Sequence, residues 1–277
     1  MTTLAARRAR LSQILAGYDG LVVAFSGGVD STFLTAAAVD VLGDRAVAAT
    51  AVSPSLPASE RREAAALARR LGVRHVEVAT DEVERPAYRR NDRDRCFHCK
   101  TALFDVLEPL AAELGLEALA LGTVIDDLDD HRPGLRAAAE RGVVAPLVEA
   151  GLSKADVRAL SRERGLPTWD KPAAACLASR VAYGLEVTAE RLQRIEEAEA
   201  WLRARLGDGV DLRVRDHGDI ARIEVPADRV AEVVALGGEV DAVLRGLGWS
   251  YVTVDLGGFR SGSMNARRSL PVVQISG

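Results

Sequence analysis

The chain has 277 residues, of which 48% are hydrophobic and 27% are charged, and its formal net charge at pH 7 is −4. This composition is typical of a folded globular protein, and the length allows two modest hydrophobic cores. The arginines are scattered among acidic residues, which argues against a nucleic-acid partner, and the sequence contains neither a secretory leader nor an apolar run of membrane-spanning length. We therefore expect a cytoplasmic protein without membrane contact, whose three cysteines are reduced, catalytic or metal-bound.

The first two thirds of the chain alternate between apolar runs and helical patterns. Helical spacing of apolar residues predicts a first helix over residues 4–15. Strands are expected at 21–25, 46–52, 73–78, 116–121 and 143–148, and helices at 31–42, 58–71, 95–114, 134–141 and 154–164. This alternation predicts an α/β domain in which helices cover both faces of a parallel sheet. Ligands of such domains bind beyond the carboxyl ends of the strands.

The pattern changes near residue 188. A charged amphipathic helix is expected at 188–206, a hairpin of two strands at 211–215 and 220–225, a helix at 227–246 and a last strand at 250–256. This order predicts a small α+β domain. We place the boundary near residue 185, which gives domains of residues 1–185 and 186–277.

A turn that suits an anion follows the first expected strand. Residues 26–31 read Ser-Gly-Gly-Val-Asp-Ser. The glycines let the backbone approach a ligand closely, and the helix that begins here presents its positive end to an anion. The lysine of a Walker A loop is missing, so the turn suits pyrophosphate as a leaving group better than transfer of a γ-phosphate. At these residues the chain resembles the PP-loop ATP pyrophosphatases, which adenylate an oxygen of their substrate.

The three cysteines are the second candidate site. Cys96 and Cys99 have the spacing that lets two thiolates converge on one ion, and Cys176 lies in a loop of small residues. Zinc would need a fourth ligand, a redox pair would leave Cys176 without a role, and an iron–sulfur cluster held by three cysteines would leave one iron open. The spacing alone leaves these three alternatives open.

Further motifs extend the resemblance to one family. They are RCFHCK at 95–100, LGTVIDD at 121–127, HRPGLRAA at 131–138, LPTWDKPAAACLASR at 166–180, YG at 183–184 and VRDHGDIARIEVP at 214–226. Together with the turn at 26–31, they are similar to LarE, the family of ATP-dependent sulfur transferases that act in synthesis of the nickel-pincer nucleotide cofactor. The resemblance extends from residue 7 to about residue 260. It implies a PP-loop domain first and a smaller α+β domain for substrate binding and oligomerisation.

The resemblance also implies a reaction. ATP and Mg²⁺ would adenylate a carboxylate of pyridinium-3,5-biscarboxylic acid mononucleotide, and sulfur would displace AMP to give a thiocarboxylate. In members with one cysteine, the residue that matches Cys176 gives up its own sulfur and becomes dehydroalanine. Members with three cysteines hold a 4Fe-4S cluster on positions that match Cys96, Cys99 and Cys176. We therefore expect the cluster here, with sacrifice of Cys176 as the fallback.

The remaining site residues are assigned on the same basis. We expect ATP to be bound by the turn and by the next strand ends, at Ala24, Ser26, Gly27, Gly28, Asp30, Ser31, Thr50, Ser53, Gly122, Thr123 and Asp127. We expect the mononucleotide to be bound by residues near the cysteines and in the second domain, at Lys100, Ser179, Arg180, Arg213, Arg215, Glu199 and Glu224. Arg213 and Arg215 alternate along one strand, so both guanidinium groups face one side, where a phosphate fits.

Three other functions compete with this interpretation. The first is a PP-loop enzyme that thiolates tRNA and uses a similar set of cysteines, although the chain lacks a basic patch. The second is amidation of an activated carboxylate, which leaves the cysteines unexplained. The third is a non-enzymatic AMP-sensing or zinc-binding module. The LarE family tends to form symmetric oligomers, so a homo-oligomer is expected.

Overall fold

The computed structural model describes residues 3–128, 133–172, 175–207 and 209–260. The chain divides into two compact units. The first contains Met1–Leu177 and Glu186–Ala189, and the second contains Ala178–Leu185 and Glu190–Gly277. The division at 185/186 remains our prediction for domains that fold separately.

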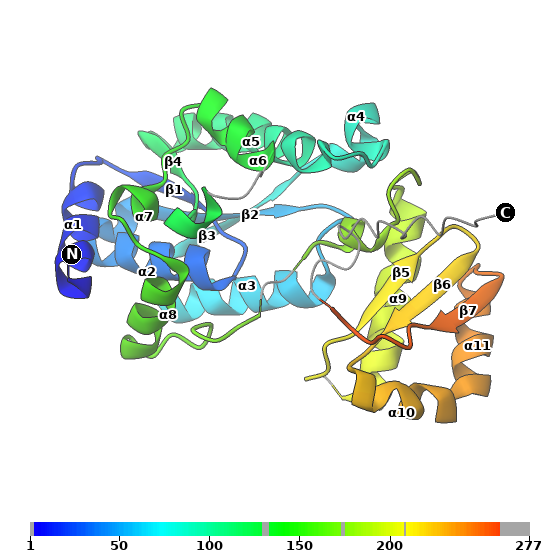
Figure 1. The fold of residues 1–277 in the computed structure, drawn as a ribbon. Coiled ribbons are helices and arrows are strands. Elements are labelled where there is room, and N and C mark those ends of the chain that lie inside the picture. The colour runs from blue at the N-terminus through cyan, green and yellow to red at the C-terminus, as the bar shows by residue number, and fades with distance from the viewer. Residues whose placement is uncertain (1–2, 129–132, 173–174, 208, 261–277) are drawn as a thin grey trace, which may run out of the picture. The chain divides into compact units, whose positions relative to one another are not determined.

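The first unit is built around a four-stranded parallel sheet with the strand order β3-β2-β1-β4 (Figure 1). Its elements are α1 (Leu4–Ala16), β1 (Leu21–Ala24), α2 (Val29–Leu42), β2 (Ala46–Val52), α3 (Ala58–Leu71), β3 (Arg74–Ala79), α4 (Pro86–Arg89), α5 (Arg95–Leu114), β4 (Ala118–Ala120), α6 (Pro133–Glu140), α7 (Pro146–Glu149) and α8 (Lys154–Glu163). In the register, Leu21 lies opposite Ala46 on β2 and Ala118 on β4.

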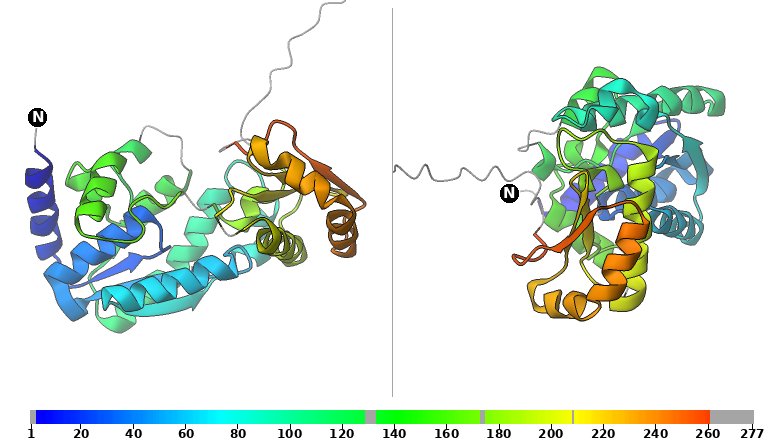
Figure 2. Two further views of the ribbon diagram at one scale, coloured as in Figure 1. Left: turned by 90° about the horizontal axis from the view of Figure 1, so that it is seen from below. Right: turned by 90° about the vertical axis from the view of Figure 1, so that its right-hand side faces the viewer.

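Helices bury both faces of this sheet. Val22 and Val47 pack against α5, whose Phe104 and Leu107 are buried in the same cluster. Leu21 and Val23 point to the opposite face and pack against α1, α2 and α8. Alternate residues of a strand point to opposite faces, so a central strand between two helical layers must be apolar throughout. Figures 1 and 2 show α5 on one side of the sheet and α2 and α3 on the other.

The second unit has a three-stranded sheet with the order β5-β6-β7. Its elements are α9 (Ala189–Leu206), β5 (Arg213–Asp216), β6 (Ile220–Glu224), α10 (Val230–Ala235), α11 (Gly237–Gly246) and β7 (Tyr251–Val254). The pair β5–β6 is antiparallel and the pair β6–β7 is parallel. Val214, Ala221 and Ile223 are buried, and the residues that alternate with them on β5 and β6 include three arginines.

The α/β fold class with a parallel sheet and a smaller mixed domain is confirmed, but two predicted elements are wrong. The expected strand at 143–148 is reduced to one isolated bridge between Val144 and Ala120. Pro146 occupies the first turn of α7, where the missing N–H of proline is tolerated and its fixed φ favours a helix. The expected helix at 227–246 is divided at Leu236, directly before Gly237 and Gly238, which have low helix propensity.

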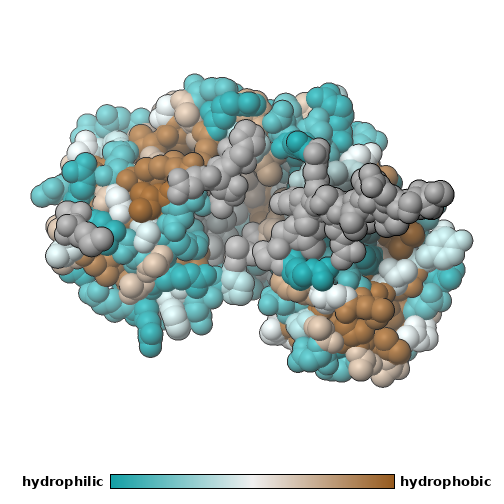
Figure 3. Space-filling model, in the orientation of Figure 1, coloured by the Kyte–Doolittle hydropathy of each residue, from teal (hydrophilic) through white to brown (hydrophobic). Residues whose placement is uncertain are grey.

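None of the helices in the described ranges is both long enough and apolar enough to cross a membrane. On the face shown in Figure 3, apolar residues gather in separate patches within a largely hydrophilic surface. The second unit exposes several large apolar side chains, including Val234 at 63%, Tyr251 at 62% and Leu256 at 83%.

Candidate active site

The turn between β1 and α2 leaves the start of a helix open to an anion. Gly28 is the N-cap of α2 and supplies no capping side chain, so the first N–H groups of the helix lack that partner. Gly27 has a φ of 69°, in the left-handed region that favours glycine. The hydroxyl groups of Ser26 and Ser31 lie 3.2 Å apart across the turn. Backbone donors, two hydroxyls and the positive end of α2 thus gather at one place.

The end of β4 packs directly against this turn. A Cβ atom on Gly122 would lie 2.7 Å from the backbone nitrogen of Ser31, which is closer than any side chain can approach. Thr123, the next residue, is buried. Only glycine at position 122 therefore lets the carboxyl ends of β1 and β4 meet, and the structure brings together two of the predicted nucleotide-binding segments.

A lysine that the sequence analysis did not select also lies at this edge of the sheet. The Nζ atom of Lys154 donates a hydrogen bond to Asp30 Oδ2, and the Lys154 backbone N–H donates to Asp126 Oδ2 at 2.7 Å. Lys154 begins α8, where a positive charge is disfavoured by the helix dipole. A cation in the first turn of a helix is thus the signal in the sequence that points to this residue.

Asp30 also has an unused oxygen. Its Oδ1 atom is buried and has no hydrogen-bond partner among the described residues. A buried carboxylate oxygen without a partner costs free energy unless a ligand satisfies it. Carboxylate oxygens are the protein ligands that Mg²⁺ prefers, so Asp30 fits a magnesium ion that accompanies a nucleotide.

The other predicted nucleotide-binding residues lie on the same edge, but several already have partners. Ala24 is half-buried at the end of β1. The hydroxyl of Thr50 is buried and donates to the Phe25 carbonyl at 2.7 Å. Ser53 donates to the buried carboxylate of Glu82, and Asp127 accepts from the backbone N–H of Val124 at 3.1 Å. These contacts hold the loops that surround the turn.

The cysteines come from two segments of the first unit. Cys96 and Cys99 lie in the first turn of α5, three residues apart and therefore on one face of the helix. Cys176 precedes Leu177, whose backbone N–H donates to the Ser55 carbonyl at 2.9 Å in the loop after β2. None of the three forms a disulfide. The Cys176 segment is thus attached to the carboxyl edge of the sheet, where the turn after β1 also lies.

Burial raises the pKa of Cys99 to about 12, and Cys176 contributes to this increase, so the two thiols lie within electrostatic reach of each other. In the described part of the chain, no group of three His, Cys, Asp or Glu side chains is arranged so that it could hold one metal ion. The set of three thiols in one region has the chemistry that an iron–sulfur cluster requires.

Tyr88 stands beside these thiols. It is 1% exposed, and its hydroxyl lies 2.7 Å from Ser55 Oγ. Burial raises its pKa, and Cys176 and Cys99 add to the increase. Lys100 lies next to the start of α6, where a Cβ on Gly134 would be 3.0 Å from Lys100 Cγ.

In the second unit, the predicted substrate-binding residues form buried ion pairs. Arg180 Nε donates to Glu199 Oε1 at 3.0 Å, and both side chains are at most 3% exposed. Arg215 donates to Glu224 at 2.9 Å and to the carbonyl of Ser179 at 3.1 Å. Burial opposes ionisation of Glu199, but Arg180 and Arg203 hold its pKa below the usual range. With Arg213, the structure thus brings six of the seven predicted substrate-binding residues together.

Arg213 joins this cluster and has no carboxylate partner among the described residues. Its guanidinium donates to the Leu212 carbonyl at 2.6 Å and lies 5.3 Å from the centre of the Phe259 ring. No ion pair joins it to a carboxylate in the described part of the chain. Burial lowers its pKa, and the nearby positive charge of Arg180 lowers it further. An anion bound beside Arg213 would relieve this repulsion.

The comparisons with known proteins agree with this geometry. Residues 8–98 match the family model of NAD synthase. A protein of Synechocystis, slr1717, is 46% identical over 92% of this chain and 95% of its own length. The pyridinium-3,5-bisthiocarboxylic acid mononucleotide synthase of Lactiplantibacillus plantarum is 40% identical over 96% of both chains.

The chain belongs to the LarE family. The resemblance read from the motifs is thereby confirmed, and the first unit is the PP-loop domain of an ATP-using enzyme. The tRNA-specific 2-thiouridylase MnmA of Azorhizobium caulinodans is also similar, at 31% identity, but the match spans only 55% of this LarE-family chain and 48% of that protein.

Sequence reasoning missed Lys154, Glu82 and Tyr88 in this LarE-family chain. Nothing in the sequence near Glu82 or Tyr88 distinguishes them from the surrounding charged and irregular segment. Their burial beside Ser53 and Ser55 becomes visible only in the folded structure.

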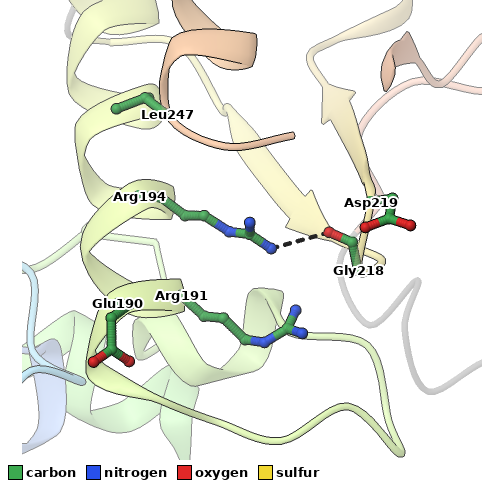
Figure 4. A pocket seen from close by; sticks show the side chains of 6 residues that line it. All are labelled: Glu190, Arg191, Arg194, Gly218, Asp219 and Leu247. Carbon is green, nitrogen blue, oxygen red and sulfur yellow. Dashed lines mark hydrogen bonds between the residues drawn. The ribbon is translucent and has the colours of Figure 1, made fainter. Parts of the chain in front are cut away.

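A pocket of about 280 Å³ in the second unit is lined by other residues: Glu190, Arg191, Arg194, Gly218, Asp219 and Leu247 (Figure 4). Both of its arginines form ion pairs with Asp216, which is fully buried. The two guanidinium groups thus share one buried carboxylate, and the pocket contains none of the predicted site residues.

Proposed function

We propose that this protein uses ATP to activate a carboxylate of pyridinium-3,5-biscarboxylic acid mononucleotide and then replaces an oxygen of that carboxylate by sulfur, releasing AMP and pyrophosphate. One observation carries this proposal. The Cys176 segment is hydrogen-bonded to the loop after β2, at the same sheet edge as the open start of α2. A sulfur-bearing residue and an anion site for pyrophosphate therefore belong to one edge of one domain. The L. plantarum relative carries the name of this activity.

The residues of the turn would bind and stabilise the leaving group. A carboxylate reacts poorly with a nucleophile because oxide would have to leave, whereas an acyl-adenylate releases AMP. In the first step the carboxylate oxygen attacks the α-phosphorus of ATP, and negative charge accumulates on the departing pyrophosphate. The N–H groups at the start of α2 and the ammonium group of Lys154 would stabilise that charge. Asp30, with its unused oxygen, would hold Mg²⁺ against the phosphates.

Lys154→Met is expected to lower substrate-dependent pyrophosphate release by about a hundredfold, because a positioned cation on a departing phosphate is worth about that much. Lys154→Arg keeps the charge and should restore part of the rate. The rates are measured with a coupled pyrophosphate assay at saturating ATP. Asp44→Asn, which alters a charge in the turn after α2, is the control. Equal rates for the wild type and Lys154→Met would remove Lys154 from the site.

We propose that Cys96, Cys99 and Cys176 hold a 4Fe-4S cluster. Cys96 and Cys99 share a helix face, and Cys176 lies within electrostatic reach of Cys99. A cluster held by these three thiolates would supply hydrosulfide as the sulfur donor. The alternative within the family is that Cys176 gives up its own sulfur, and then Cys96 and Cys99 have no direct part in the transfer.

Anaerobically reconstituted protein is expected to contain about four irons per chain and to absorb broadly in the visible region, as [4Fe–4S] clusters do. Cys96→Ala distinguishes the two sulfur sources. A cluster donor predicts that product formation is lost, whereas sacrifice of Cys176 predicts one retained turnover. Mass spectrometry after turnover completes the test, because conversion of cysteine to dehydroalanine removes about 34 Da, the mass of H₂S. Colourless protein without iron after reconstitution would disprove the cluster.

Arg213 is the best candidate to bind the phosphate of the mononucleotide. Its charge is not balanced by a carboxylate in the described residues, while Arg180 and Arg215 are already paired with Glu199 and Glu224. A planar guanidinium suits two phosphate oxygens at once. We assign the paired residues to holding Arg213 and Ser179 in place, and Lys100 to the substrate next to Cys99.

The runner-up function, thiolation of tRNA, is favoured by the partial similarity to MnmA. The even mixture of acidic and basic residues favours the small substrate. Binding of tRNA that weakens steeply with salt would support the runner-up. Release of pyrophosphate only in the presence of the biscarboxylic mononucleotide supports the proposed function.

We further propose that the protein is a cytoplasmic homo-oligomer. The exposed apolar side chains of Val234, Tyr251 and Leu256 support an interface on the second unit. Light scattering coupled to size-exclusion chromatography measures the assembly directly, and a monomer at micromolar concentration would contradict it.

A further inference from the structure

Two helices of the first unit each contact both the PP-loop turn and residues 169–171, which come shortly before Cys176 in the sequence. The first is α3. A Cβ atom on Gly27 would lie 3.3 Å from the Cα of Ala64, so α3 packs closely against the turn. On the same helix, Glu60, one turn before Ala64, and Glu63, the residue before Ala64, accept hydrogen bonds from Lys171 Nζ at 2.8 and 2.9 Å. Lys171 lies five residues before Cys176.

The second helix is α8. Its first residue, Lys154, pairs with Asp30 of the turn. One helical turn later, Arg158 donates to the carbonyl groups of Trp169 and Lys171, both at 3.2 Å. The spacing of four residues puts Lys154 and Arg158 on one face of α8. Residues 169–171 are therefore held by side chains from both helices.

The ion pair between Lys171 and Glu60 is partly shielded from water. The side chain of Lys171 is 20% exposed and that of Glu60 is 21% exposed, so water screens this pair less than a surface pair. Burial opposes ionisation of Lys171, but Glu60 and Glu63 outweigh it and raise the pKa of the lysine. The ammonium group therefore keeps its charge at any physiological pH. Arg158 contacts main-chain oxygens, which defines the position of the backbone itself.

We propose that Lys171 and Arg158 are positioning residues. They hold residues 169–171 on the N-terminal side of Cys176, as the hydrogen bond from Leu177 to Ser55 does on its C-terminal side, so that sulfur is close to the adenylate as soon as it forms. This inference rests on the proposed function. A displacement of about 1 Å between reacting groups is enough to lower a rate severely. An adenylate that waits for sulfur reacts with water instead. We call the contacts of Lys171 and Arg158 the clamp. Loss of the clamp therefore leaves adenylation of the carboxylate intact and uncouples it from sulfur transfer.

The test compares Lys171→Met with Arg61→Met. Arg61 is the next residue after Glu60 on α3, and its ion pair with Glu77 is exposed, so Arg61→Met removes one ion pair from α3 without removing the contacts of Lys171 and Arg158. For Lys171→Met we expect pyrophosphate release within about threefold of the wild type, and about a tenfold lower yield of thiocarboxylate per pyrophosphate released. Lys171→Arg should restore the yield, and Arg61→Met should leave it unchanged. Rate and yield that fall in parallel, or an unchanged yield, would overturn the proposal.

Hydrogen exchange provides a readout that needs no substrate. The backbone N–H groups of Trp169 and Lys171 are bonded to Leu166 and Thr168 within the clamped segment. They should exchange at least tenfold faster in Lys171→Met than in Arg61→Met, because local opening of the segment becomes easier. If the wild type releases no pyrophosphate with the mononucleotide, the proposed function fails and this measurement alone decides the clamp. Unchanged exchange in Lys171→Met would then reject it.

Discussion

Replacing Cys176 by alanine is expected to lower thiocarboxylate formation by more than about a thousandfold while pyrophosphate release continues. The thiol is lost from the segment attached to Ser55, but the turn after β1, Asp30 and Lys154 are untouched. The adenylate therefore still forms and is released or hydrolysed. Both sulfur mechanisms make the same prediction, because Cys176 is either the donor or a ligand of the donor.

Cys176→Ser is the control for side-chain size, since it keeps the volume and replaces only the sulfur. Thiocarboxylate and pyrophosphate are measured in one reaction, by mass spectrometry and by a coupled assay. Full turnover by either variant would remove Cys176 from the chemistry. Loss of pyrophosphate release together with product would instead show that the substitution damages the turn.

Glu199→Gln is expected to lower the free energy of unfolding of the second unit by about 3 kcal/mol, because it leaves a buried guanidinium without its counter-charge. The Arg180 side chain is 3% exposed, and Glu199 is its ion-pair partner. Glu197→Gln is the matched control, since Glu197 is exposed on the same helix and accepts a hydrogen bond only from Gln193 in the described part of the chain. Urea unfolding in a Trp169→Phe background reports the second unit alone, because the other two tryptophans, Trp201 and Trp249, belong to it.

The same pair predicts how stability depends on acid. The pKa of Glu199 is lower in the folded protein than its ordinary value. Its contribution is therefore complete above about pH 4.3, the ordinary pKa of glutamate, and is lost as the pH falls through the lower folded value. In Glu199→Gln this part of the pH dependence should disappear. A variant whose unfolding free energy falls with acid as steeply as the wild type would contradict the assignment.

The order of strands and helices in the first unit was predictable because local signals agree with the final packing. Val22 and Val23 form a continuous apolar run since helices cover both faces of β1. Gly122 was predicted to bind nucleotide because it follows a strand. The steric reason for glycine at this position becomes visible only in the structure, where β4 lies beside β1. Val144 was misassigned because an apolar run next to proline reads equally well as a strand or as the approach to a helix.

The parts of the site that could not be predicted depend on contacts between distant segments. Lys154 and Asp30 are separated by 124 positions, and nothing in either neighbourhood identifies the other. The pairing of Arg180 with Glu199 joins the end of a 3₁₀ helix, Leu177–Arg180, to α9. Local sequence indicates which residue types are available at a strand end, whereas partner choice among charged residues is decided by tertiary packing.

The strand order has a consequence for how the protein is made. The central strand β1 pairs on one side with β2, which follows closely, and on the other with β4, which emerges roughly a hundred residues later. Gly122, which packs against the start of α2, lies two residues after the end of β4. A growing chain can therefore assemble three strands early but cannot complete its nucleotide edge until β4 has joined. This late closure delays ATP binding until most of the first unit has been synthesised, and long-range parallel pairing of this kind is a slow step in folding.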